Sequence, residues 1–376
     1  MKLLAPVMAL AVLAALPFVA CDRSGKTFNL GGVAPVTGEG ATFGLSDRNA
    51  MKLAVEEWNA KGGVLGKKVR LFYADDKGDP AEGATVFTKL IEQERVSAIV
   101  GAAWTKVSLA GAPICQERGV PMISPTSTNP KVTLVGDHIF RACFIDPFQG
   151  TIGARFCIQE LKAKKAACLF DIGNDYTRGL AEFFAEQFKA MGGEITGFEA
   201  YATGSPDFKV QLTKIIHGRP DIIYAPNYYH DASLICKQAR ELGFNSPIVG
   251  GDGWDSSKLV EIGGPAVDGC FFTAHYAKDD PRPRIQDFVK LYRAKYNTDP
   301  DGNACMAYDA THLLLDAVRR AGSSEGKAIR DALQATDLEV VSGRIKFDQN
   351  RNPVKPAAVI EVKNGTFRYH STIQPI

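Results

Sequence analysis

The sequence has no excess of charge of either sign. Its 376 residues include 44 Lys and Arg against 42 Asp and Glu, a formal net charge of +2 at pH 7. Nucleic acids and anionic membranes bind strongly basic surfaces, so this balance predicts no nucleic acid partner. Hydrophobic residues make up 45% and charged residues 23% of the chain. These values exclude a disordered protein and are typical of a folded one.

The sequence also lacks the short motifs of common enzymes. It contains no phosphate-binding loop, no HExxH zinc motif and no GxSxG nucleophile turn. Gly38, Gly40 and Gly44 form GxGxxxG, which is one residue longer than the dinucleotide-binding GxGxxG. The six histidines are scattered, and no group of Cys and His has the spacing of a zinc site. We therefore predict a protein that is not an enzyme and that uses neither a cofactor nor a metal.

The cysteines follow no redox or disulfide pattern. None of the eight forms CxxC. Seven remain beyond Cys21, and an odd number cannot be fully paired within one chain. Most lie in apolar segments, where a cysteine is usually a small buried hydrophobic residue. We expect buried thiols, although one disulfide could form in an oxidising compartment.

Long hydrophobic runs are absent after the first twenty residues. Those twenty carry one charge, Lys2, followed by an apolar run from Leu3 to Ala20 that Pro6 and Pro17 interrupt. Such a segment is typical of a secretory signal, so residues 1–20 are predicted to be a signal peptide. Cys21 follows Ala20, as in the cleavage site of bacterial lipoproteins, and is a candidate for a lipidated N-terminus.

The rest of the chain alternates strands and helices. Apolar runs and helical periodicity predict strands at 28–36, 68–76, 96–103, 120–125, 166–171, 194–201, 220–225 and 247–250, with helices between them. The pair Asp79-Pro80 predicts the start of one helix, because Asp caps a helix and Pro is favoured in its first turn. Repeated βαβ units predict an α/β protein with parallel sheets, arranged as two Rossmann-like lobes. After Gly269 we expect helices at 281–296, 304–321 and 324–335, then strands at 343–347 and 357–362.

Polar and aromatic residues gather where the predicted strands end, which is where α/β sheets bind ligands. Thr105 and Thr128 stand at helix starts, whose free N–H groups favour an anion such as a carboxylate. Asp252 lies between two glycines after a buried strand, a suitable position for a cation. Several aromatic side chains could form an apolar slot: Phe43, Trp104, Tyr176, Tyr228, Tyr229 and Trp254. Together these residues suit a zwitterion, although each could instead be an ordinary cap, turn or core residue.

Seven segments of the chain form a recognisable series: APVTGEGATFG (34–44), residues 54–80, PMISPTSTNP (121–130), FRACFIDPFQG (140–150), GNDYTRGLA (173–181), residues 224–244 and GGDGWDS (250–256). In this order they resemble one known family, the substrate-binding proteins of branched-chain amino acid ABC transporters. These are type I periplasmic binding proteins of the leucine/isoleucine/valine-binding kind. The matching segments cover most of the chain after the signal.

The resemblance implies two lobes joined by three crossovers, near 146, 275 and 350. Lobe 1 would comprise 27–146 plus 276–350, lobe 2 would comprise 147–275 plus 351–376, and the ligand would bind in the cleft between them. It further implies a monomer in the periplasm that captures an amino acid, branched-chain or otherwise apolar, and delivers it to an inner-membrane ABC permease. A sensing module on the same fold, or a binder of an amide, urea or aromatic acid, remains the alternative.

The resemblance also assigns ligand contacts to individual residues. Thr105 and Thr128 would bind the ligand carboxylate, and the backbone carbonyl of Thr126 would accept a hydrogen bond from the ammonium. Asp252 would hold the ammonium where the family usually has Glu. The slot would be lined by Tyr176, Tyr228 and Phe43. Trp104 and Trp254, together with the shorter acid, depart from the family pattern and would reshape the pocket.

Overall fold

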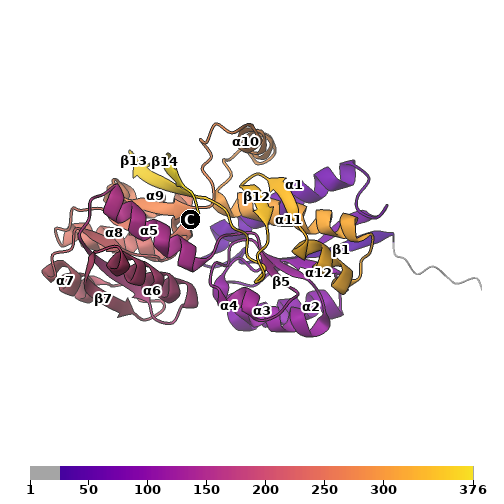
Figure 1. The fold of residues 1–376 in the computed structure, drawn as a ribbon, viewed down its shortest axis with the longest axis horizontal. Coiled ribbons are helices and arrows are strands. Elements are labelled where there is room, and N and C mark those ends of the chain that lie inside the picture. Colours follow the sequence, from indigo (N-terminus) through magenta and orange to yellow (C-terminus); the bar gives the residue numbers. More distant parts are fainter. Residues whose placement is uncertain (1–25, 376) are drawn as a thin grey trace, which may run out of the picture.

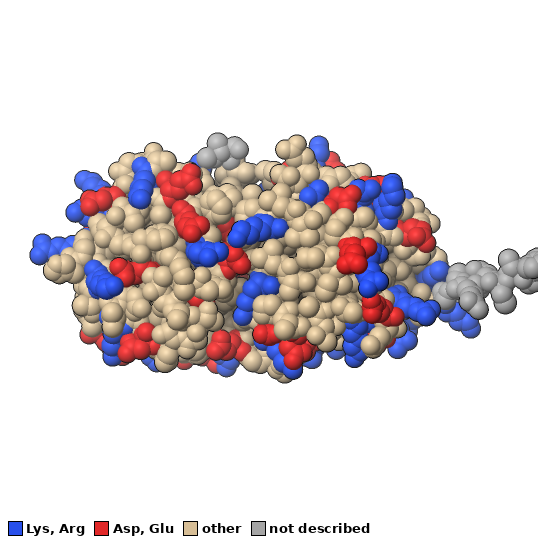
Figure 2. Space-filling view, turned by 90° about the horizontal axis from the view of Figure 1, so that it is seen from below, with Lys and Arg blue, Asp and Glu red and all other residues tan. Residues whose placement is uncertain are grey.

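The computed structural model describes residues 26–375 and shows two α/β lobes that lie side by side (Figure 1). The predicted signal peptide and the lipid site at Cys21 lie outside the described residues. Figure 2 shows Lys and Arg interspersed with Asp and Glu over both lobes of one face, as expected from the balanced composition. No helix within residues 26–375 combines the length and the apolar character needed to cross a bilayer.

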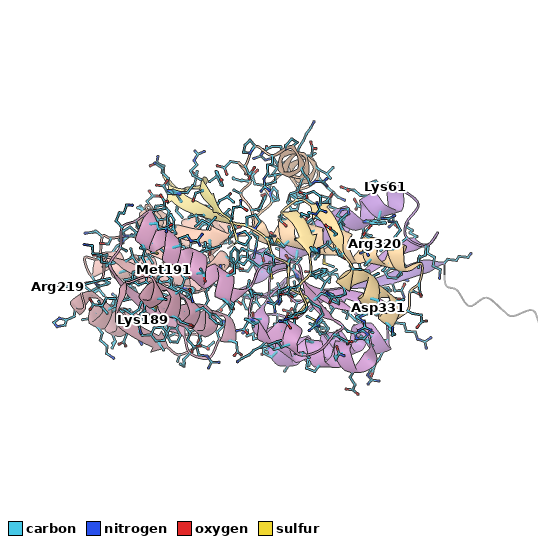
Figure 3. All side chains as sticks on the ribbon, in the orientation of Figure 1. Lys61, Lys189, Met191, Arg219, Arg320 and Asp331 are labelled. Carbon is cyan, nitrogen blue, oxygen red and sulfur yellow. The ribbon has the colours of Figure 1, made fainter. Side chains whose placement is uncertain are left out.

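The first lobe is built on a five-stranded parallel sheet. Its strand order is β2-β1-β3-β4-β5. The strands are β1 (Thr27–Ala34), β2 (Lys68–Asp75), β3 (Ala98–Val100), β4 (Met122–Ser124) and β5 (Ile139–Arg141). The helices of this part are α1 (Ala41–Ala60), α2 (Pro80–Glu92), α3 (Thr105–Arg118), α4 (Lys131–Leu134), α11 (Gly302–Ala321) and α12 (Gly326–Gln334). Helix α1 packs against α11, and α2 packs against α3. Lys61, Arg320 and Asp331 belong to this lobe in Figure 3.

The second lobe is built on a seven-stranded mixed sheet of order β14-β13-β10-β9-β8-β6-β7. Its strands are β6 (Lys165–Asp171), β7 (Glu194–Tyr201), β8 (Ile222–Tyr224), β9 (Ile248–Gly250), β10 (Phe271–Ala274), β13 (Ala357–Lys363) and β14 (Thr366–Ile373). Strands β6 to β10 are parallel, whereas β13 and β14 are antiparallel to their neighbours. The helices are α5 (Asp146–Gln159), α6 (Asp175–Ala190), α7 (Lys209–His217), α8 (Tyr229–Glu241) and α9 (Ser257–Gly263). Lys189, Met191 and Arg219 belong to this lobe in Figure 3.

The chain passes three times between the two sheets. It leaves the first sheet after β5, returns after β10 through α10 (Pro283–Tyr296), and passes back into β13 after the small hairpin β11 (Asp337–Val340) and β12 (Gly343–Lys346). The lobe boundaries at 146/147, 275/276 and 350/351 stay predictions. Because the chain crosses three times, segments from the middle and the end of the sequence lie on both sides of the space between the sheets.

The structure confirms the predicted α/β class with parallel strands, and it confirms the predicted start of one helix, α2. The Asp79 side chain caps α2 by accepting the N–H groups of Ala81 and Glu82 at 2.8 and 3.0 Å. Strands β5, β10, β11 and β14 were not predicted. Strand β14 has no alternating burial because most of its side chains are exposed or half-buried, so it carries no apolar pattern. The seven cysteines among the described residues are buried free thiols.

Candidate ligand-binding site

A cavity lies between the lobes, next to the carboxyl ends of β3, β4 and β9. The space measures about 370 Å³ including its opening to solvent. Both lobes and the second crossover contribute to its lining, which consists of Phe43, Ala103, Trp104, Thr105, Thr126, Tyr176, Tyr228, Asp252, Gly253, Asp255, His275, Gly302 and Asn303. Seven of the eight predicted site residues are therefore brought together here.

Thr128 is the predicted site residue that does not line the cavity. It is completely buried, on the loop that follows β4. Its backbone carbonyl accepts the Asp146 N–H at 3.0 Å, and burial raises the pKa of the Asp146 carboxyl to about 8. Thr128 therefore does not lie at the cavity, where the predicted contact with a ligand carboxylate would require it.

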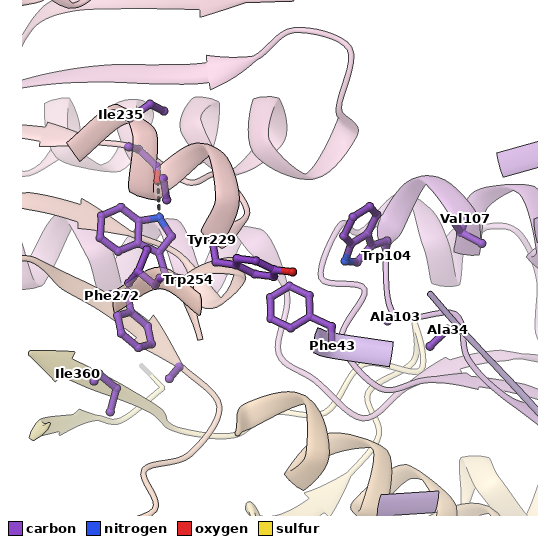
Figure 4. Packing of buried hydrophobic residues seen from close by; sticks show 14 of the residues in the cluster. Ala34, Phe43, Ala103, Trp104, Val107, Tyr229, Ile235, Trp254, Phe272 and Ile360 are labelled. Atoms are coloured by element: carbon purple, nitrogen blue, oxygen red, sulfur yellow. Dashed lines mark hydrogen bonds between the residues drawn. The ribbon is translucent and has the colours of Figure 1, made fainter. Parts of the chain in front are cut away.

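Aromatic rings from the two lobes stack across the cavity. The ring of Trp104 lies 4.4 Å from that of Tyr228, with 13° between their planes, and Tyr228 lies 5.2 Å from Tyr176 at 25°. Phe43 meets Tyr228 edge-on at 6.3 Å. Figure 4 shows Phe43 and Trp104 of the first lobe facing Tyr229 and the second lobe. Four of the six aromatic residues predicted for the apolar slot therefore line the cavity, and they come from both lobes, whereas Tyr229 and Trp254 are not part of the lining.

Trp254 is, with Trp104, one of the two aromatic residues expected to depart from the family pattern. It lies in the core of the second lobe and not at the cavity. It is completely buried. Its indole Nε1–H donates to the Ala225 carbonyl at 2.9 Å, the dashed line in Figure 4. The ring also lies directly against Gly250, where a Cβ atom would clash with it. Trp254 therefore supports the loop that carries Asp252 and has no direct place in the lining.

Asp252 is held by three neutral donors. Its Oδ1 accepts hydrogen bonds from Gln149 Nε2 and from the Tyr176 hydroxyl, both at 2.9 Å. Its Oδ2 lies 3.1 Å from His275 Nε2. Burial lowers the pKa of His275, so the ring is neutral near pH 7 and donates its Nε2–H to Asp252. Neutral donors orient a carboxylate without cancelling its charge, so Asp252 remains available to a cation.

The opposite wall of the cavity presents hydroxyl and N–H groups. Thr105 is the first residue of α3, and among the described residues no side chain caps this helix. The Val107 N–H donates to the Trp104 carbonyl at 3.1 Å, and this helix start, which lines the cavity through Trp104 and Thr105, is a favourable place for an anion. The Thr126 hydroxyl donates to the Ala103 carbonyl at 2.9 Å, and Ser124 donates to the Ala102 carbonyl at 2.7 Å. These bonds hold the two loops in place.

Sequence reasoning missed four polar positions in the lining. His275 follows β10, whose apolar run FFTA was a usable but overlooked strand signal. Gly302 and Asn303 begin α11, which Asp301 caps by accepting the Ala304 N–H at 2.8 Å. Asp255 accepts the Gly302 N–H at 2.9 Å, and burial together with Asp301 raises its pKa to about 8.

Hydrogen bonds between the lobes close the cleft around the cavity. The hydroxyl of Tyr229 on α8 donates to the Glu39 carbonyl in the loop before α1. The Asn129 side-chain amide donates to the Asp175 carbonyl at 2.8 Å, and the Lys131 ammonium lies 3.1 Å from the Asp175 carboxylate. The structure therefore represents a closed arrangement of the lobes. Within residues 26–375, no group of three or more His, Cys, Asp or Glu has the arrangement of a metal site.

Known proteins share both the sequence pattern and the fold of this chain. The model of the family described as periplasmic binding protein matches residues 27–366. The Leu/Ile/Val-binding protein BraC3 of Rhizobium johnstonii is 30% identical over 341 residues, 90% of this chain and 91% of its own. The crystal structure of the leucine binding protein LivK of Thermotoga maritima has a TM-score of 0.89 and 38% identity, covering 92% of this chain and 99% of that one. LivJ of Streptococcus pneumoniae, solved in complex with isoleucine, has a TM-score of 0.88 and 35% identity over 93% and 100%.

Proposed function

The chain belongs to the periplasmic binding protein family, and we propose that it captures an α-amino acid with a branched-chain or other apolar side chain and delivers it to an ABC permease. One observation carries the proposal: a closed cavity between two lobes has a buried carboxylate on one wall and a free helix N-terminus on the other. That arrangement suits the two charges of an amino acid. The relatives named for leucine, isoleucine and valine support the same ligand class.

In this proposal Asp252 binds the ligand ammonium, and Thr105 with the first turn of α3 binds the carboxylate. A buried charge needs an opposite charge or several hydrogen bonds, because its desolvation costs several kcal/mol. The Thr126 backbone carbonyl supplies a further acceptor for the ammonium. The aromatic residues Phe43, Trp104, Tyr176 and Tyr228 enclose the remainder of the ligand. Thr128 is completely buried outside the cavity lining and makes no direct ligand contact in this proposal.

We also propose that the chain is exported and that it catalyses no reaction. Residues 1–20 would be removed as a signal peptide, and the chain would act in the periplasm as a monomer that binds its ligand without converting it. A lipid on Cys21 would attach it to the membrane. Intact-mass analysis of the protein from a membrane fraction should show a lipid-modified Cys21 as the first residue. An unmodified Cys21, or a chain that begins elsewhere, would refute the anchor.

A ligand screen by thermal unfolding tests the proposal. A ligand that binds only the folded state raises the free energy of unfolding by RT ln(1 + [L]/Kd). The panel contains the twenty amino acids together with an aliphatic amide, urea and benzoate. We expect the melting temperature to rise with one or more apolar amino acids and not with the others. A rise with the amide, urea or benzoate alone would overturn the proposal.

A further inference from the structure

Trp104 lines the cavity and is held in place on several sides. Its side chain reaches from the start of α3 to the backbone of two loops of the same lobe. A Cβ atom at Gly40 would come within 2.7 Å of the indole ring, and one at Gly78 within 2.6 Å. The ring therefore rests directly on backbone at both positions and cannot move away from the cavity on that side.

The other lobe confines the indole from its face. Tyr228 stacks on it at 4.4 Å, and Tyr228 is itself stacked on Tyr176. The Lys106 ammonium lies 5.4 Å from the ring centre, which adds a favourable cation–π contact. Trp104 is only 7% exposed. Its position is thus determined by backbone on one side and by an aromatic stack on the other.

We propose that Trp104 sets the upper size limit of the ligand, so that the site prefers a small side chain such as that of alanine to that of leucine. This inference rests on the proposed amino acid function and narrows its substrate class. Leucine carries three more carbon atoms than alanine, and inserting them into a packed site forces side chains out of place.

Expansion of the cavity would require the loss of contacts that close the cleft. The hydrogen bonds from Tyr229 to Glu39 and from Asn129 to Asp175 join the two lobes on either side of the cavity. Asp255 and Gly302 form a third bond between them, at 2.9 Å. A large ligand would break these bonds or displace Trp104, whereas a small ligand would leave both unchanged.

Calorimetry with a graded series of ligands tests the inference. Glycine, alanine, valine, leucine and phenylalanine are titrated into the wild type, Trp104→Ala and the control Trp58→Ala. Trp58 lies on α1 and bonds to His312 on α11, away from the cavity lining. We expect the wild type to bind alanine at least tenfold more tightly than leucine. Trp104→Ala should shift the ratio of the two dissociation constants toward leucine by at least tenfold, and Trp58→Ala should leave it unchanged.

The outcomes separate this inference from the proposed function. If the wild type binds leucine as tightly as alanine, or if Trp104→Ala weakens all ligands in parallel, the size limit is refuted while the amino acid function stands. If no amino acid binds to the wild type or to either variant, both proposals fail. Should Trp104→Ala not fold, as judged by circular dichroism, Trp104→Phe replaces it, and the same shift toward leucine is expected in smaller measure.

Discussion

At the residue scale, Asp252 shows how neighbouring side chains hold a buried carboxylate in place. A carboxylate with a side-chain exposure of 9% would be costly to keep charged without partners. Gln149, Tyr176 and His275 supply three hydrogen bonds to it, and all three donors are neutral. The charge is therefore stabilised and oriented, but it is not neutralised. A cationic group entering the cavity supplies the missing opposite charge.

Removal of this acid should abolish most of the affinity. Loss of one partner of a buried ion pair costs about 3–5 kcal/mol, which at 1.4 kcal/mol per factor of ten corresponds to roughly two to three and a half decades in Kd. Asp252→Ala and Asp252→Asn should both show this loss in calorimetry with the native ligand. Asp268→Asn, on the exposed turn before β10, is the control and should bind normally. Binding by Asp252→Asn within about threefold of the wild type would contradict an ammonium contact.

A second buried acid, Asp146, should make stability depend on pH. Burial raises the pKa of this carboxyl to about 8, so the folded state holds a proton that the unfolded state loses near pH 4. The stabilising contribution is complete below about pH 4 and is lost as the pH rises through about 8. Asp146→Asn cannot lose a proton. Relative to the wild type, its melting temperature should therefore rise between pH 5.5 and pH 9, by roughly a few °C.

The pH comparison uses thermal unfolding of both proteins in the same buffers. Asp268→Asn again serves as a control, because its carboxylate is exposed and should give an equal difference at both pH values. An equal melting-temperature difference for Asp146→Asn at pH 5.5 and pH 9 would contradict the protonated state of this residue.

At the scale of elements, the residue at which a helix begins affects which side chains reach the cavity. Helix α6 begins after Asn174, whose side chain accepts the Tyr176 N–H at 3.1 Å. The hydroxyl of Tyr176 then donates to Asp252 and accepts the Gly253 N–H at 3.0 Å. One capping residue thus determines where a helix begins and where a cavity side chain points.

The cap predicts a joint effect on stability and binding. Asn174→Ala removes an N-cap and should lower the free energy of unfolding by about 1 kcal/mol, within a range of about 0.5–2 kcal/mol. Ligand affinity should fall as well, because Tyr176 loses its anchored position. Asn174→Ser retains a capping oxygen and should recover most of both losses. Urea denaturation and calorimetry measure the two quantities. A stability loss with unchanged affinity would show that Tyr176 does not depend on the cap.

At the scale of the whole molecule, closure brings the functional groups together. Asp252, Tyr176 and Tyr228 belong to the second lobe, whereas Thr105 and Trp104 belong to the first. We expect the two lobes to rotate as rigid bodies about the three chain connections between the sheets. A ligand that contacts both walls favours the closed arrangement, because only that arrangement offers all its contacts.

Small-angle scattering should detect this closure. A compact closed chain of this length has a radius of gyration of about 20 Å. We expect a larger value without ligand and a decrease toward 20 Å at saturating ligand, whereas Asp252→Ala should retain the larger value at the same ligand concentration. An unchanged radius in the wild type at saturation would contradict closure on binding.

Local sequence patterns were sufficient to predict the structural features that depend only on a short segment of the chain. The Asp79-Pro80 cap, the buried parallel strands and the polar residues at their ends depend on neighbours in the chain, so they could be predicted. Strand β14 and the positions of His275 and Asn303 at the cavity were not predicted, although the apolar run of β10 was a usable signal for the strand before His275. An exposed antiparallel edge strand has no apolar alternation, and the other two residues reach the cavity only because the chain returns to it from β10 and α11.

The sequence by itself thus determined the α/β class, the strand ends and the chemical types of the groups that face a ligand. Only the tertiary structure decided which groups meet. Trp104 and Tyr228 are stacked although they lie in different lobes, and Asp252 finds its partners on α5, α6 and the crossover after β10. Contacts between residues far apart in the chain depend on sheet order and on lobe closure, which are properties of the whole packed molecule and are not encoded in any single segment.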